Sequence, residues 1–304
     1  MKERNESLDC LKGIAILLVM FGHVQVHNHM TDPYLYDVIK SIQMPMFFLI
    51  SGYLAGTGKK ITNLEQYRKK IGRRAVAYLL PFFSWLVVQH MTYVPQALRT
   101  VLFQLDYGLW FLMALFLFTV LCYTAQLLEA VTEKEIAFWA VWLTGCCVIL
   151  VSYLAGVTFL SPSILIIYLP YYTVAYFVGR HRVETYAPAS MQRWIAGLCA
   201  VVFLVMVVML DLVTVTGIGM LGVQTAASFL GCFWLIRMVL DWKTCELKRK
   251  LSKLGTYTLE IYVIHYQFAT VLNPDKTAYA FWSVEGLLYA AAAFVAMSVI
   301  TAAL

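Results

Sequence analysis

The stretch LKGIAILLVMFGHVQVHNH, residues 11–29, opens near a lysine, continues as an apolar run and ends with three histidines. An apolar run of this length is what a helix needs to cross a hydrocarbon core about 30 Å thick. Lys2 and Arg4 precede the run, as in a signal peptide, but no cleavage site of small residues follows it. We therefore expect a retained first membrane span.

The composition of the whole chain agrees with this reading. Of its 304 residues, 61% are hydrophobic and 13% charged, whereas soluble domains have about 45–50% apolar and about 25% charged residues. We predict an all-α integral membrane protein with about ten transmembrane helices in one bundle, forming a single multi-pass domain over residues 1–304. The predicted spans are 11–27, 38–56, 71–94, 107–129, 134–154, 162–179, 192–216, 218–240, 254–272 and 282–304.

The net charge of +6 is distributed as in a membrane protein and not as in a nucleic-acid-binding protein. Twenty of the 23 lysines and arginines lie in the N-terminus or in one alternating set of loops. Short basic loops stay in the cytoplasm, so we expect both termini to be cytoplasmic, with membrane lipid and no nucleic acid as a partner. The last span ends at Leu304 without a basic flank, which leaves a truncated chain as an alternative.

A metal site is not expected. The seven cysteines show no paired spacing and are predicted to be free thiols. His23 and His27 have the i, i+4 spacing of a metal-binding pair. However, no acidic or cysteine partner lies near them in the sequence, and a wet loop at the outer interface explains His27 and His29.

Lys12 and His23 share one side of the first span. Each residue of a helix turns by about 100°, so eleven residues bring His23 to roughly 20° from Lys12, some 16 Å along the axis. A lysine at the membrane edge can extend to water. An imidazole deep in a span is costly unless it faces a polar cavity, which makes His23 a candidate functional residue. A hydrogen bond to a neighbouring helix is the alternative.

A second histidine is predicted at the same depth. The span that begins LGTYTLEIYVIHYQF, residues 254–268, runs in the same direction as the first, and His265 lies eleven residues from its start. Glu260 is expected to be buried on the same helix, five residues earlier and on a different face. Two histidines and a carboxylate in the membrane favour a polar cavity, because lipid disfavours all three.

Two further motifs have both a structural and a functional interpretation. Ser51 and Gly52 follow Pro45 in the second span, where small residues usually serve close helix packing but also admit a ligand. Arg73 and Arg74 open the third span, where a basic pair contacts anionic lipid or binds the phosphates of a nucleotide-bearing donor. The sequence does not separate these alternatives.

Taken in order, five blocks of the sequence resemble the acyltransferase-3 membrane family, particularly its fucose-4-O-acetylase-like branch. The blocks are SLDCLKGIAILLVMFGHV, MPMFFLISGYL, the paired arginines with LLPFF, LWFLMALFL and LGTYTLEIYVIH. The first is the most specific, since the family has a basic residue, ten others and then a histidine, matched here by Lys12 and His23. The family often has arginine at the first position, and lysine keeps the charge but loses bidentate phosphate contact.

The resemblance implies transfer of an acyl group, usually acetyl from acetyl-CoA, to a hydroxyl of a cell-surface carbohydrate or lipid-linked glycan. By similarity, His23 is the essential first-span histidine, Lys12 is its basic partner, Arg73 and Arg74 match the arginines of the third-span entry, and Ser51 with Gly52 matches the second-span motif. We expect His23 to act as general base and Lys12, Arg73 and Arg74 to hold the phosphates of CoA. We expect His265 or Glu260 to orient His23 or relay its proton. A covalent acyl intermediate, a glycan exporter or flippase without transfer activity, and a structural subunit are the alternatives.

Overall fold

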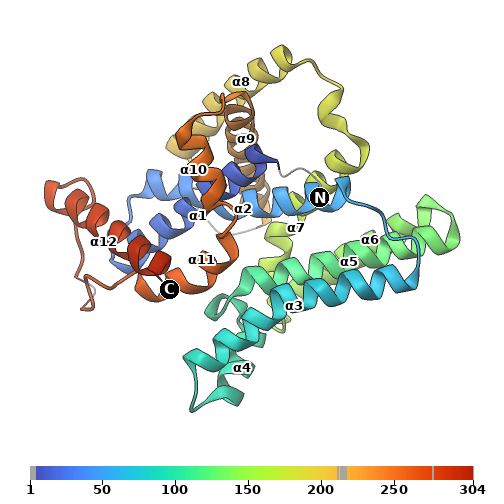
Figure 1. The fold of residues 1–304 in the computed structure, drawn as a ribbon, viewed down its shortest axis with the longest axis horizontal. Helices are drawn as coiled ribbons and strands as arrows, with labels where there is room; N and C mark the ends of the chain where they lie inside the picture. The colour runs from blue at the N-terminus through green and yellow to red at the C-terminus, as the bar shows by residue number, and fades with distance from the viewer. Residues whose placement is uncertain (1–4, 211, 213–217, 276, 304) are drawn as a thin grey trace. The chain divides into compact units, whose positions relative to one another are not determined.

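The computed structural model describes residues 5–210, 212, 218–275 and 277–303. All regular elements in these ranges are helices, which confirms the all-α fold class (Figure 1). Within them, nine helices are long and apolar enough to cross a membrane. These are α1 (Glu6–His27), α2 (Pro33–Thr57), α3 (Leu64–Gln89), α5 (Trp110–Thr132), α6 (Glu135–Leu154), α7 (Pro162–His181), α8 (Ala189–Met209), α9 (Ile218–Asp241) and α12 (Val284–Ala303).

The remaining elements are short. They are α4 (Val94–Phe103), η1 (Leu105–Tyr107), η2 (Val183–Thr185), α10 (Glu246–Leu254), α11 (Thr258–Ile264) and η3 (His265–Phe268). Among them, α11 and η3 lie where a single span, 254–272, is predicted. That prediction of one continuous helix is wrong, since α10 ends at Leu254, a turn follows, and the α-helix changes to a 3-10 helix at His265.

Although broken, the segment 255–269 runs along α1 from one end to the other. At its start, Gly255 is packed against the backbone of Asp9 and Gly13. At its end, the carbonyl of Ala269 accepts a hydrogen bond of 2.9 Å from the side chain of Asn28. The segment is therefore parallel to α1, as predicted, and its helical residues form two short pieces, α11 and η3.

At α1 and α3, a capping residue rather than the end of the apolar run marks the start of the helix. The side chain of Asn5 accepts hydrogen bonds from the amides of Ser7 and Leu8, at 3.1 and 3.2 Å, and starts α1. The side chain of Asn63 caps α3 in the same way through the amide of Gln66, at 2.9 Å. An N-cap side chain satisfies amides that have no partner within the helix. Helix α3 consequently begins seven residues before the predicted start of its span.

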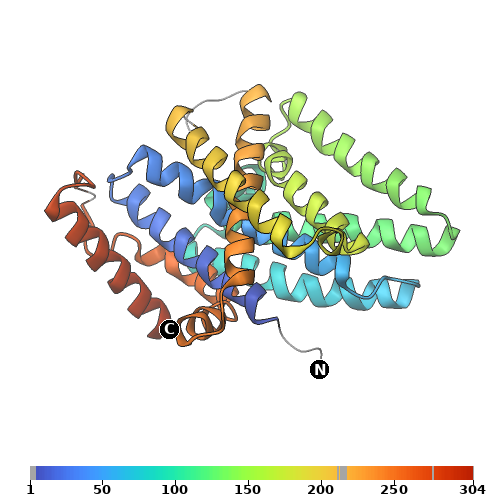
Figure 2. The ribbon, with the colours of Figure 1, turned by 90° about the horizontal axis from the view of Figure 1, so that it is seen from above.

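The chain divides into two compact units, one of residues 1–50 and 185–304 and one of residues 51–184. In the first unit, α8 packs against α9, and α1 packs against α10, α11 and α12 (Figure 2). A buried apolar cluster joins α1, η3 and α12. Its buried members are Met20, Val24, Met30, Ala269, Phe281, Ala290, Ala293 and Met297.

In the second unit, α5 packs against α3, α6 and α7 (Figure 1). The rings of Phe138, Trp142 and Tyr176 stack in its centre, with the centroid of Phe138 at 5.8 Å from Trp142 and 5.4 Å from Tyr176. Beside them, the guanidinium of Arg180 binds both carboxylate oxygens of Glu129, at 2.8 and 2.9 Å. An aromatic core and an ion pair thus fix this unit.

Candidate active site

The structure brings His23 and His265 together. His23 lies in the C-terminal half of α1 and is partly buried, whereas His265 is the first residue of η3 and is only 1% exposed. Their ring centroids are 5.2 Å apart. Both histidines sit in the first unit, and their contact follows from the parallel course of α1 and the segment 255–269.

The hydrogen bond of His265 fixes its tautomer. Its Nδ1 lies 2.7 Å from the carbonyl oxygen of Ile261. Because a carbonyl can only accept, Nδ1 carries the proton, and in the neutral ring Nε2 holds a lone pair. This Nε2 is buried and has no hydrogen-bond partner among the described residues. His265 therefore presents an unused proton acceptor beside His23.

The sequence interpretation missed two members of this cluster. The ring of His27 stacks on His23, with centroids 5.5 Å apart. Tyr266 packs edge-on against both rings, at 5.1 Å from His23 and 4.8 Å from His27. The i, i+4 spacing of His23 and His27 in the sequence is a signal that the two rings lie on one side of a helix. The prediction of a wet loop at His27 is wrong, because α1 continues to that residue. Tyr266 gave no signal of its own beyond following His265.

Lys12 lies eleven residues before His23 on the same helix, at the end of α1 that contacts α10. Its Nζ forms a salt bridge of 2.9 Å with Asp9, and the lysine side chain is 24% exposed. The Lys12 side chain is thus accessible to a ligand, and its salt bridge with Asp9 limits where the ammonium group can lie.

The prediction that Glu260 is buried is wrong. Glu260 is exposed and not buried, and it lies in the first turn of α11. Five residues separate it from His265, a rotation of about 500°, so the two side chains point to different sides of the segment. A carboxylate is also favourable at this helix end. Glu260 therefore has no place beside the two imidazoles.

Arg73 and Arg74 are exposed residues of α3, in the second unit. The guanidinium of Arg74 donates to the hydroxyl of Tyr78, at 3.1 Å. One helical turn earlier, Nζ of Lys70 lies 5.5 Å from the ring centre of Tyr123. This part of α3 carries exposed cations next to tyrosine rings, a surface that suits an anionic ligand.

Ser51 and Gly52 also belong to the second unit. A Cβ on Gly52 would overlap the carbonyl oxygen of Tyr172 and lie 3.0 Å from its carbonyl carbon. One turn later, Gly56 is packed in the same way against Tyr176. The spacing is that of close helix packing between α2 and α7. Packing accounts for Gly52, whereas a role for Ser51 stays a prediction.

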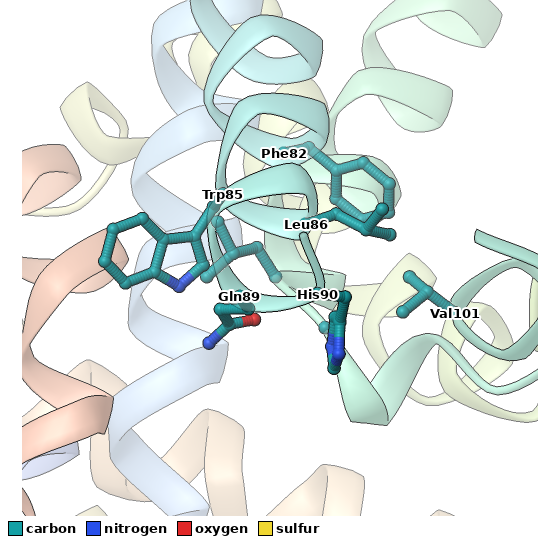
Figure 3. Close-up of a pocket in the computed structure, with 8 residues that line it drawn as sticks. Phe82, Trp85, Leu86, Gln89, His90 and Val101 are labelled. Atoms are coloured by element: carbon teal, nitrogen blue, oxygen red, sulfur yellow. The ribbon is translucent and has the colours of Figure 1, made fainter. Parts of the chain in front are cut away.

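A small pocket in the second unit contains none of the predicted residues. It lies where the end of α3 faces α4 and is lined by Phe82, Trp85, Leu86, Gln89, His90, Val101, Gly108 and Leu109 (Figure 3). Across the described ranges, no group of three or more His, Cys, Asp or Glu residues is arranged to hold a metal ion. The histidine cluster of α1 and η3 is therefore the candidate active site.

Fold and site define a helical, multi-pass membrane protein with paired imidazoles in its bundle. The family model described as an acyltransferase domain, Acyl_transf_3, matches residues 5–304. The chain belongs to the acyltransferase-3 family, and its membrane location follows from that membership and from the long apolar helices. The fucose-4-O-acetylase-like branch stays a prediction.

Two curated relatives are similar to parts of the chain. Nodulation protein NolL of Mesorhizobium japonicum is 31% identical over 170 residues, covering 54% of this chain and 39% of the relative. Nodulation protein NolL of Sinorhizobium fredii is 35% identical over 89 residues, covering 27% of this chain and 23% of the relative. The matches thus span less than half the length of either relative. No solved structure matches the chain.

Proposed function

We propose that the chain is a membrane O-acyltransferase that moves an acetyl group from acetyl-CoA to a hydroxyl of a cell-surface carbohydrate or lipid-linked glycan. Membership of the acyltransferase-3 family supports the reaction class. The observation that carries the assignment of the site is the contact between His23 and His265, with ring centroids 5.2 Å apart.

In the proposed mechanism, His23 is the general base. It takes the proton of the acceptor hydroxyl as the oxygen attacks the thioester carbonyl, because one nitrogen of a neutral imidazole has a lone pair that can accept a proton. The bond from carbon to sulfur then breaks, and the protonated imidazole returns the proton to the CoA thiolate. Atoms and charges balance without a further reactant.

His265 is proposed to orient His23. The lone pair on its buried Nε2 can accept a hydrogen bond from the imidazole N–H of His23, while Ile261 holds the opposite side of its ring. A base held in one orientation by a third group is a recurring arrangement in acyl transfer. In this site the neutral imidazole of His265 would orient His23, because Glu260 is exposed and does not lie beside the two imidazoles.

The donor is proposed to bind through cations. Lys12 is the candidate in the first unit, and Arg73 with Arg74 are the candidates in the second. Their guanidinium and ammonium groups suit the phosphates of CoA. From Lys12, the roughly 16 Å to His23 along α1 would be covered by the pantetheine arm.

The test is transfer of radiolabelled acetyl from acetyl-CoA to surface glycan, in membranes with wild-type protein or matched amounts of His23→Ala. We expect label on the glycan with the wild type and its loss with the variant. A correctly inserted His23→Ala protein that transfers at the wild-type rate would refute the role of His23. No transfer by the wild type over a broad panel of glycans would favour a glycan exporter.

A further inference from the structure

Asn28 forms a buried connection between the two segments that carry the histidines. Its side chain is fully buried at the C-terminal cap of α1. Its Nδ2 donates to the carbonyl of Val24 at 2.7 Å and to that of Ala269 at 2.9 Å. Its Oδ1 accepts a hydrogen bond of 2.8 Å from the hydroxyl of Tyr289 on α12. Both donors and the acceptor of this amide are in use.

The location of these bonds relates them to the histidine pair. Asn28 lies five residues after His23, and Ala269 lies four residues after His265. The bond between them joins α1 to the segment 255–269 about one helical turn beyond each histidine. Another partner of the amide, Val24, is the residue next to His23.

Packing alone does not fix the register of these segments. The buried residues around the amide, such as Met20, Val24 and Ala269, form apolar contacts that have no direction. A hydrogen bond requires its donor and acceptor at a set distance and angle. The hydrogen bonds of the Asn28 side chain therefore define the axial position of α1 against the segment 255–269, which the apolar cluster does not do.

We propose that Asn28 is a positioning residue, whose amide sets the register between α1 and the segment 255–269 and thereby the separation of the His23 and His265 imidazoles. The effect on catalysis rests on the proposed acyl transfer, whereas the effect on the two rings does not. An aspartate cannot replace the amide, because it has no N–H to donate and would bury a charge.

The chain offers a matched control. Asn273 is also a buried asparagine of the first unit, and its amide makes bonds of 2.8 and 2.9 Å, but both go to Thr277 in the same loop. Replacing Asn273 removes another buried asparagine amide without touching the link between α1 and its neighbour. Tyr289→Phe is a milder test, since it removes one of the three bonds of Asn28 and keeps the ring.

The experiment compares full-length wild type with Asn28→Ala, Asn28→Asp, Tyr289→Phe and the control Asn273→Ala, each in detergent with selectively 15N-labelled histidine. Imidazole 15N shifts report the tautomer and contacts of each ring, and a His265→Gln sample assigns its signals. We expect the shifts of His23 and His265 to move in both Asn28 variants, to a smaller extent in Tyr289→Phe, and not in the control.

The same proteins are assayed for acetyl transfer. We expect kcat to fall by about 10²-fold in Asn28→Ala, as for a displaced catalytic group, with the KM for acetyl-CoA almost unchanged and both constants unaltered in Asn273→Ala. Unchanged imidazole shifts in folded Asn28→Ala or Tyr289→Phe would overturn the proposal. A second outcome is that the imidazole shifts move in the Asn28 variants while neither the wild type nor any variant transfers acetyl. That outcome would overturn the proposed function and leave the positioning of the rings by Asn28 in place.

Discussion

The glycine pair at the contact of α1 and α10 allows a quantitative prediction. A Cβ on Gly255 would overlap the carbonyl oxygen of Asp9 and lie 2.6 Å from its carbon and 3.0 Å from the amide nitrogen of Gly13. These neighbours are backbone atoms, which cannot turn aside as a flexible side chain can. With Gly255→Ala, the two helices would have to separate by about 1 Å to restore ordinary contact in a packed interior.

Overpacking of this kind costs about 1–3 kcal/mol. Gly255 itself has ordinary right-handed helical dihedral angles, φ −60° and ψ −15°, so alanine introduces no backbone strain there. The whole effect is therefore steric. In domains of comparable size, each kcal/mol lowers the melting temperature by roughly 2–4 °C. We therefore expect Gly255→Ala to lower the melting temperature by roughly 2–12 °C.

The assay is thermal unfolding of detergent-purified protein, followed by loss of the monodisperse chromatography peak. The matched control is Gly197→Ala in α8, where a Cβ would meet nothing within 4 Å. Alanine favours a helix over glycine by about 1 kcal/mol, so this control should be unchanged or more stable. If Gly255→Ala is as stable as Gly197→Ala, the close approach of α1 and α10 is not as the structure has it.

Three further outcomes are expected. His265→Gln should reduce kcat at least about tenfold without changing the melting temperature, because it removes the lone pair of a ring nitrogen, and full activity would exclude a role for that nitrogen. Arg180→Met should lower the free energy of unfolding by about 3 kcal/mol, since Glu129 loses its buried partner, whereas Arg182→Met, at an exposed pair, should change it by under about 1 kcal/mol; equal melting curves would contradict this. Lys12→Met should raise the KM for acetyl-CoA while Lys12→Arg keeps it, and an unchanged KM in both would remove Lys12 from the donor site.

Most of the helical layout could be predicted from the sequence. The predicted span 134–154 and helix α6 differ by one residue at the start, because the charged residues Glu133, Lys134 and Glu135 mark where the apolar run begins. The start of α3 could not be placed from hydropathy, since polar residues after Asn63 continue the helix beyond the apolar run. Hydropathy reports where a helix meets lipid and not where its hydrogen bonding begins.

The histidine site was predicted in part. The common direction of the two segments and the equal spacing of His23 and His265 from their starts predicted that the two imidazoles lie at the same depth, and the structure places their ring centroids 5.2 Å apart. The same reasoning predicted that Glu260 is buried, and this prediction is wrong because the side chain is exposed. Depth along a span can be counted from residue numbers, but the side of a helix that faces a neighbour depends on how the helix is rotated in the bundle.

The sequence by itself determined that this chain is a helical membrane protein and which of its ionisable residues lie deep in its spans, because transfer into hydrocarbon depends on composition and length. Only the tertiary structure decided that the ninth predicted span changes from an α-helix to a 3-10 helix at His265, that His27 and Tyr266 join the cluster, and that Asn28 connects both histidine segments. These features depend on directional hydrogen bonds and ring contacts between residues up to 261 positions apart, which no local pattern in the sequence records.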